Sequence, residues 1–271
     1  MSSEFQIPDF MKEVVRFTNS VCAPIAWHRV DDTTKTPFPG GSCFFLRFSD
    51  RIVGVTANHV ITAYHGARVK APQLPFQISK LTFDIDAALI DRDDSLDLAT
   101  FGISETQVQI TDAATIDCRG AWPPPLPKIN SVLSLAGFPE ESRTIATSGR
   151  IEFRMYSALP MVDGLSDTEI IVTHEQSRDK AAMDFLPSPP PRFNMSGCSG
   201  GPVLMHGTLN GIHRWFAVGA IVQGPGGIAS GEAEDFEMIR IRRIDCINND
   251  GTINRLGSGW LPPRTFVDPR D

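Results

Sequence analysis

The sequence predicts an all-β chain in two halves, each a β-barrel or a β-sandwich. Short apolar runs separated by turn residues recur along it, as in Ser42–Phe48 and Leu98–Ile103, and runs of this kind are typical of strands. The 22 glycines and 21 prolines favour many turns over long helices. Proline cannot join a central sheet, so the proline-rich stretch from Asp117 to Lys128 indicates a linker between the halves.

The elements follow in chain order. Asp9 opens a short helix with Phe10, Val14, Val15 and Phe17 on its apolar face. The first half has predicted strands at Ser42–Phe48, Arg51–Ala57, Ala88–Arg92 and Leu98–Ile103. The second half has them at Ser131–Gly137, Gly149–Met155, Glu169–His174, Gly201–Gly207 and Trp215–Gly224. The predicted organisation is a helical extension (1–24), a first β-unit (25–116), the linker (117–130), a second β-unit (131–250) and a tail (251–271).

The charge, the absence of targeting segments and the cysteines argue against several kinds of partner and location. The net charge of −7 and the single short basic cluster Arg240–Arg243, interpreted as a solvated strand edge, argue against a nucleic-acid partner. No stretch resembles a signal peptide or a membrane span, so neither secretion nor a membrane is expected. Five widely spaced cysteines indicate free thiols in a reducing compartment, and we expect a cytoplasmic protein without structural metal or cofactor.

The stretch NMSGCSGGPVL, from Asn194 to Leu204, carries the strongest chemical signal. Glycines at positions 197, 200 and 201 flank Ser199, which indicates a backbone path that other residues could not follow. We interpret Ser199 as a nucleophile on a tight turn. The backbone N–H groups of Gly197 and Ser199 are predicted to point at a developing oxyanion.

A serine nucleophile needs a base and a carboxylate that orients the base. His59 stands in VTANHVI, at a small-residue break after an apolar strand, where a polar ring can reach a cleft. Asp97 directly precedes the strand Leu98–Ile103, so we choose it as the carboxylate, with Asp94 as the runner-up. The three other aspartates, Asp91, Asp93 and Asp94, are interpreted as a solvated turn.

The segments TANHV, DLATF and GCSGGPV, in this order, resemble the trypsin/chymotrypsin-like serine proteases, especially bacterial and intracellular members. GSCFFL, AGFP and TSGRI strengthen the likeness, which spans roughly residues 35 to 245. The resemblance implies two antiparallel six-stranded β-barrels of the chymotrypsin-like kind, with His59 and Asp97 from the first barrel and Ser199 from the second. It implies a serine endopeptidase that acts on a polypeptide substrate and needs no cofactor.

The chain departs from the secreted members of that family. They carry an aspartate before the serine, which pairs with a new N-terminus after propeptide cleavage, and here that position is Cys198. By the resemblance, Phe193 lies at the floor of the primary pocket and Val222, Gln223 and Gly224 form its wall. Since no acid marks the floor, we expect an apolar substrate side chain. A second alignment places Gly211–His213 on the wall instead.

Three other interpretations remain. Gly197–Gly201 also fits the G-x-S-x-G elbow of α/β-hydrolases, which would make the protein a serine esterase, but the order His–Asp–Ser and Pro202 argue against it. A Cys198 nucleophile, as in viral relatives, is less favoured, because its neighbours Gly197 and Ser199 do not fit the G-x-C-G pattern of those enzymes. The chain could also be a catalytically silent binding module of the same fold, although such loss usually replaces one of the three residues. The sequence does not determine the oligomeric state.

Overall fold

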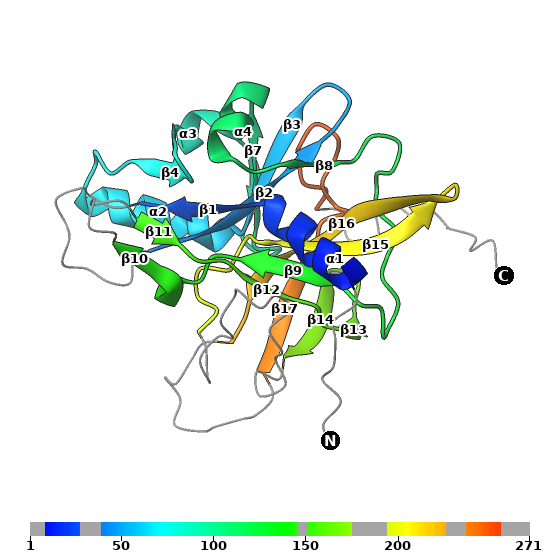
Figure 1. Ribbon diagram of the computed structural model, residues 1–271. Helices are drawn as coiled ribbons and strands as arrows, with labels where there is room; N and C mark the ends of the chain where they lie inside the picture. The colour runs from blue at the N-terminus through cyan, green and yellow to red at the C-terminus, as the bar shows by residue number, and fades with distance from the viewer. Residues whose placement is uncertain (1–8, 28–38, 146–150, 175–193, 226–236, 256–271) are drawn as a thin grey trace, which may run out of the picture.

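In the computed structural model, the protein consists mainly of two curled antiparallel β-sheets (Figure 1). The structure describes residues 9–27, 39–145, 151–174, 194–225 and 237–255. The predicted all-β fold with two barrel-like units and a short N-terminal helix is therefore confirmed. In the described ranges the sheets hold eight and seven strands, where six each were expected, because short edge segments add to them.

The first sheet is antiparallel except where its last strand runs parallel to the second. One of its inner strands, Ile52–Thr56, is buried at all five positions, as expected for the largely apolar run IVGVT. The order in space is β5-β4-β1-β2-β3-β7-β6, with β8 beside β2. The strands are β1 (Cys22–Ala26), β2 (Gly40–Arg47), β3 (Ile52–Thr56), β4 (Phe76–Ile78), β5 (Leu81–Phe83), β6 (Leu89–Asp93), β7 (Leu98–Ile103) and β8 (Thr115–Asp117).

The second sheet has the order β12-β9-β15-β16-β17-β14-β13 and is built around a long hairpin. The hairpin strands are β15 (Pro202–Leu209) and β16 (Ile212–Gln223). The other strands are β9 (Ser134–Gly137), β12 (Tyr156–Ala158), β13 (Val162–Leu165), β14 (Glu169–His174) and β17 (Glu237–Arg243). A separate pair, β10 (Arg143–Ile145) and β11 (Ile151–Phe153), follows the short 3₁₀ turn η1 (Glu140–Ser142).

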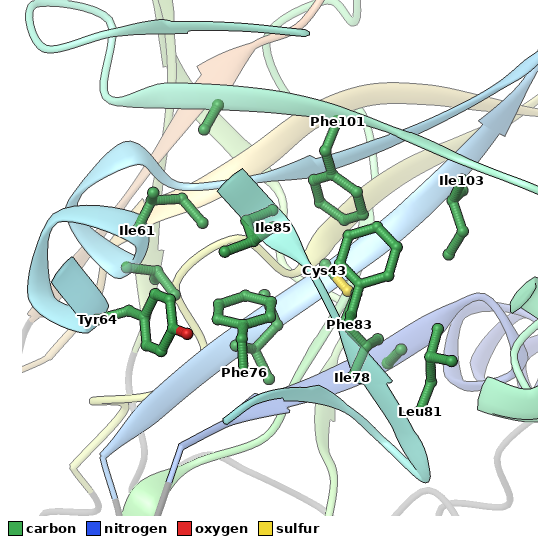
Figure 2. Packing of buried hydrophobic residues seen from close by; sticks show 14 of the residues in the cluster. Cys43, Ile61, Tyr64, Phe76, Ile78, Leu81, Phe83, Ile85, Phe101 and Ile103 are labelled. Carbon is green, nitrogen blue, oxygen red and sulfur yellow. The ribbon is translucent and has the colours of Figure 1, made fainter. Parts of the chain in front are cut away.

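Four α-helices surround the sheets in the described part of the chain: α1 (Asp9–Ser20), α2 (Asn58–Lys70), α3 (Ile85–Ala88) and α4 (Glu105–Thr111). Helix α2 was not predicted from the sequence. It forms because Val60, Ile61 and Tyr64 fall on one helical face and are buried. Figure 2 shows Ile61 and Tyr64 in the core of the first sheet, and this packing fixes the start of the helix.

A shared apolar layer joins the two sheets. It combines Phe44 and Leu46 of β2 with Leu204 of β15 and Ala220 of β16, all fully buried. Helix α1 also bridges the halves, because the hydroxyl of Thr18 donates to Ser134 Oγ at 2.7 Å. At its end, the Ser20 carbonyl accepts from the N–H of residue 114, just before β8, at 2.7 Å.

Candidate active site

His59 and Asp97 meet because their strands are neighbours in the first sheet. His59 lies in the first turn of α2, directly after β3, and Asp97 lies just before β7, which pairs with β3. Asp97 Oδ2 is 2.7 Å from His59 Nδ1, and Asp97 Oδ1 accepts the His59 backbone N–H at 2.8 Å. A carboxylate only accepts, so Nδ1 carries the proton and Nε2 is the free acceptor of the neutral ring.

The backbone around Asp97 is shaped to keep this contact. Asp97 has φ +53°, a left-handed conformation that aspartate tolerates better than most residues, and its carbonyl accepts the Asn58 N–H at 3.2 Å. The ring of His59 is about half exposed, with 49% of the side chain accessible, while that of Asp97 is 25% accessible. The dyad therefore has a sheltered carboxylate and a ring that solvent or substrate can reach.

The other aspartates of this segment have different partners. Asp94 accepts from the Asn58 amide at 2.6 Å and shares no hydrogen bond with His59 in the described residues. Asp91 and Asp93 bind Arg255, whose Nη1 lies 2.9 Å from Asp91 and whose Nε lies 2.8 Å from Asp93. They form an ion-pair cluster with the C-terminal segment, not the solvated turn that the sequence suggested.

The Ser199 turn packs against the strands that lead to His59. The Ser199 carbonyl accepts the Ser42 N–H at 2.8 Å. Gly200 has φ +85°, and a Cβ there would lie 2.1 Å from the Ser42 carbonyl and 2.9 Å from the Ala57 nitrogen, two residues before His59. Only glycine fits this path, and the close packing brings the Ser199 backbone to the start of α2.

A second approach joins the Ser199 turn to α2. A Cβ on Gly41 would lie 2.7 Å from a methyl of Val60, the residue after His59, and 3.2 Å from the Ser199 carbonyl oxygen. The structure thus brings together the segments of all three predicted residues. In the described residues the Ser199 hydroxyl and the His59 ring share no hydrogen bond. Such contacts are often long without substrate and tighten when it binds.

Two backbone N–H groups of the turn lack hydrogen-bond partners in the described part of the chain: those of Gly197 and Ser199. The N–H of Cys198, between them, donates to the Met195 carbonyl at 2.9 Å. The Ser196 carbonyl accepts from Glu140 N–H at 2.7 Å, so in a trans peptide the Gly197 N–H points away from Glu140. With φ +93° at Gly197, this geometry leaves two donors for an oxyanion.

The hydroxyl of Ser42 connects the two sheets directly behind this turn. It donates to the Gly197 carbonyl at 2.9 Å and accepts the Phe138 N–H at 2.9 Å, and the side chain is fully buried. Sequence reasoning did not find this residue. The segment GSCFFL was noted, but its serine gains a role only through residues about a hundred or more positions away.

Cys198 faces the interior and is unsuited to nucleophilic attack. It is fully buried, and burial raises the pKa of its thiol far above the ordinary value. A Cβ on Gly137 would lie 2.9 Å from its sulfur. The thiol therefore packs under the turn against Gly137, whereas Ser199 is partly exposed.

The predicted pocket wall follows directly on the Ser199 turn. The Gly200 N–H donates to the Ile221 carbonyl at 2.7 Å, so Val222, Gln223 and Gly224 continue past the serine. Gly224 must remain glycine, because a Cβ there would lie 2.9 Å from Met195 Cβ. Val222 is buried and Gln223 is exposed. Phe193, the predicted floor, lies outside the described residues.

The alternative wall at Gly211–His213 lies at the wrong end of the hairpin. Thr208 pairs with His213, whereas Pro202 pairs with Ala220 beside the Ser199 turn. Six residues of extended strand between these pairs span roughly 20 Å. The ring of His213 stacks on His206 instead. The alternative alignment is therefore wrong.

Other kinds of site find little support. Among the described residues, no three His, Cys, Asp or Glu side chains are grouped to hold a metal ion. A cavity of about 600 Å³ between Arg47 and Glu105 contains none of the predicted site residues. Within the described ranges, no helix has both the length and the apolar character needed to cross a bilayer.

Comparison with known proteins adds no family. The chain matches no family model and no curated sequence.

Proposed function

We propose that the protein is a serine endopeptidase that hydrolyses peptide bonds with Ser199, His59 and Asp97. The observation that carries the proposal is the double attachment of His59 to Asp97, through the backbone N–H at 2.8 Å and Nδ1 at 2.7 Å. The two bonds hold the ring in one orientation, and the side chain is still half exposed, so solvent or substrate can reach it. The trypsin/chymotrypsin-like proteases, which the sequence resembles, use such an arrangement.

The proposed mechanism gives each of these residues one role. Nε2 of His59 takes the proton of the Ser199 hydroxyl as its oxygen attacks the carbonyl carbon of the scissile peptide. Asp97 stabilises the resulting imidazolium. The N–H groups of Gly197 and Ser199 bind the negative oxygen of the tetrahedral intermediate. His59 then gives its proton to the leaving amine, and water, activated by the same ring, hydrolyses the acyl-enzyme.

The substrate in this proposal is an extended polypeptide with an apolar side chain before the cleaved bond. Between Ile221 and Gln223 the pairing of β16 with β17 shifts register, which leaves Val222 out of the ladder beside the Ser199 turn. A substrate strand can pair with backbone at this point. Met195, packed against Gly224, gives this wall an apolar character.

The competing functions have less support. An α/β-hydrolase elbow needs a helix after the serine, but here the strand β15 begins at Pro202. A silent binding module remains the second candidate, although no member of the triad is replaced. Five buried, unpaired thiols favour a reducing compartment, and we propose the cytoplasm.

Labelling with a fluorophosphonate, which phosphonylates activated serines, tests the proposal. Full-length protein should be labelled at Ser199, as mapped by mass spectrometry, and should cleave members of a peptide library. Ser199→Ala should abolish both while Ser196→Ala, a matched exposed serine in the same turn, should retain them. Labelling that maps to Ser196, or that survives in Ser199→Ala, would reject the assignment. A folded protein that is neither labelled nor active would favour the binding module.

A further inference from the structure

Arg143 is a buried cation directly behind the oxyanion turn. Only 3% of the residue is exposed, at the point where η1 passes into β10. Its Nη2 donates to the Phe138 carbonyl at 2.9 Å, and its guanidinium lies 5.8 Å from the centre of the Phe153 ring. Arginine is seldom buried without interactions that compensate it, because transferring its charge out of water costs free energy.

The guanidinium packs against Gly197, whose backbone N–H is one of the two proposed oxyanion donors. A Cβ on Gly197 would lie 2.7 Å from Arg143 Nη2, 2.7 Å from the Phe138 carbonyl and 2.9 Å from the Glu140 nitrogen. On the other side, a Cβ on Gly40 would lie 2.6 Å from Arg143 Nη1. The side chain is thus wedged between the Gly197 turn and β2.

Arg143 also closes a network that fixes both ends of the turn. Arg143 donates a hydrogen bond to the Phe138 carbonyl, and the Phe138 N–H donates to the Ser42 hydroxyl. That hydroxyl in turn donates to the Gly197 carbonyl. The Glu140 N–H, two residues along, holds the Ser196 carbonyl at 2.7 Å. The peptides on both sides of Gly197 are therefore held by the segment that Arg143 anchors.

The charge on Arg143 persists at neutral pH. Burial lowers the pKa of its guanidinium to about 10, and the nearby Glu140 partly opposes this shift. The residue before Ser199, where the secreted proteases that the sequence resembles carry an aspartate, is the buried thiol Cys198. In this chain the charged group packed against the turn is Arg143.

We propose that Arg143 is a positioning residue that holds the Gly197–Ser199 turn in the conformation able to bind an oxyanion. The inference rests on the proposed protease function. Arg143 touches neither substrate nor the reacting atoms. It acts by keeping the Phe138–Glu140 segment, and through it the Gly197 peptide, in one orientation. The turn is then competent without cleavage of the chain.

The test compares Arg143→Met, Arg143→Lys and a control, Arg242→Met. Arg242 is also a buried arginine, 8% exposed, but it pairs with Glu169 in the second sheet and does not contact the turn. Each variant is assayed for kcat and KM on a peptide substrate. Each is also assayed for inhibition by a peptide aldehyde of the same sequence, whose adduct with Ser199 places a charged oxygen in the oxyanion hole.

Arg143→Met should lower kcat by about 10²- to 10³-fold, the range for loss of one oxyanion donor, with KM changed less than about threefold. Affinity for the aldehyde should fall by the same factor as kcat. Arg143→Lys, which keeps the charge but loses the planar fork, should lie between wild type and Arg143→Met. Arg242→Met should keep wild-type kcat and aldehyde affinity.

A folded Arg143→Met with wild-type kcat and aldehyde affinity would overturn the inference, and so would equal losses in Arg242→Met. If Arg143→Met fails to fold, the folded Arg143→Lys decides in the same way. Hydrogen exchange over residues 194–201 gives a readout that needs no activity, and it should accelerate in the Arg143 variants only. Wild-type protein unlabelled by fluorophosphonate would reject the protease function. Labelling at Ser199 with unchanged Arg143 variants would reject this inference alone.

Discussion

Asp97→Asn replaces one atom of the side chain that holds His59 at two points. Oδ1 accepts the backbone N–H of His59, and Oδ2 faces Nδ1. An asparagine has one oxygen and one NH₂ group. The backbone N–H cannot become an acceptor, so the amide oxygen must stay on it and the NH₂ group must face Nδ1. Nδ1 then has to accept, and the proton moves to Nε2.

That tautomer cannot act as a base toward Ser199, because Nε2 no longer has a free lone pair. We expect kcat to fall by roughly ten-thousand-fold at neutral pH, the loss typical of this change in serine proteases. At about 1.36 kcal/mol per factor of ten, the transition state loses about 5.5 kcal/mol of stabilisation. KM should change little, since Asp97 lies behind the ring, away from the proposed substrate path.

The assay is steady-state hydrolysis of a peptide substrate, with circular dichroism to verify folding. Asp94→Asn is the matched control, because Asp94 accepts from Asn58 at 2.6 Å and, among the described residues, shares no hydrogen bond with the ring. It should keep kcat within about threefold of wild type, because the change removes no hydrogen bond to the His59 ring. If Asp94→Asn were crippling and Asp97→Asn mild, the choice of carboxylate would be wrong. If neither mattered, the triad would be refuted.

Three further changes test the fold around the site. Gly200→Ala should lower the free energy of unfolding by more than about 4 kcal/mol or prevent folding, since its Cβ would lie 2.1 Å from the Ser42 carbonyl. Gly211→Ala, also at positive φ but with open space around it, should lower it by only about 1 kcal/mol in urea unfolding. Similar losses for the two variants would contradict the described packing. The Arg255 guanidinium beside Asp91 holds the pKa of that carboxyl below its usual value, so its contribution is present above the unfolded pKa of about 3.9 and is lost as pH falls through the lower folded pKa. Arg255→Ala should therefore destabilise by about 1 kcal/mol at pH 7 and progressively less below pH 4, and a pH-independent difference would show another cause. All five thiols are buried, so a thiol-reactive dye should label none in native protein and five after denaturation, and reductant should leave activity unchanged; native labelling or loss of activity in reductant would count against this.

Local patterns were sufficient to predict the dyad and the serine turn. His59 and Asp97 each adjoin an apolar strand, and the strands around them were found within a few residues of their observed ends. The glycines around Ser199 signalled a restricted backbone path, and two of them, Gly197 and Gly200, do have positive φ. These features depend on residues close in sequence, which is why pattern and spacing revealed them.

Features that depend on distant partners were missed or misread. Arg240–Arg243 was interpreted as a solvated edge, but β17 lies between β16 and β14, and Arg242 and Arg243 are buried beside Glu169 and Asp245. The local sequence does not distinguish a basic run on the surface from a basic run that pairs with carboxylates of other segments. The roles of Ser42 and Arg143 were hidden for the same reason. Helix α2 was missed because its apolar positions follow a strand without an intervening turn signal.

The two sheets divide the proposed machinery unequally. The histidine and its carboxylate are hydrogen-bonded within one sheet, while the serine sits on the other and reaches them through the Ser42–Ser199 contact and the apolar layer between the halves. A small slide of one half over the other would leave every strand intact and the dyad undisturbed, yet would carry the nucleophile out of range. In this proposal, the rate of catalysis therefore responds to a change in the relative position of the two halves that a spectroscopic measure of strand content would not detect. Helix α1 is hydrogen-bonded to both halves, so it acts as a brace that resists such a slide.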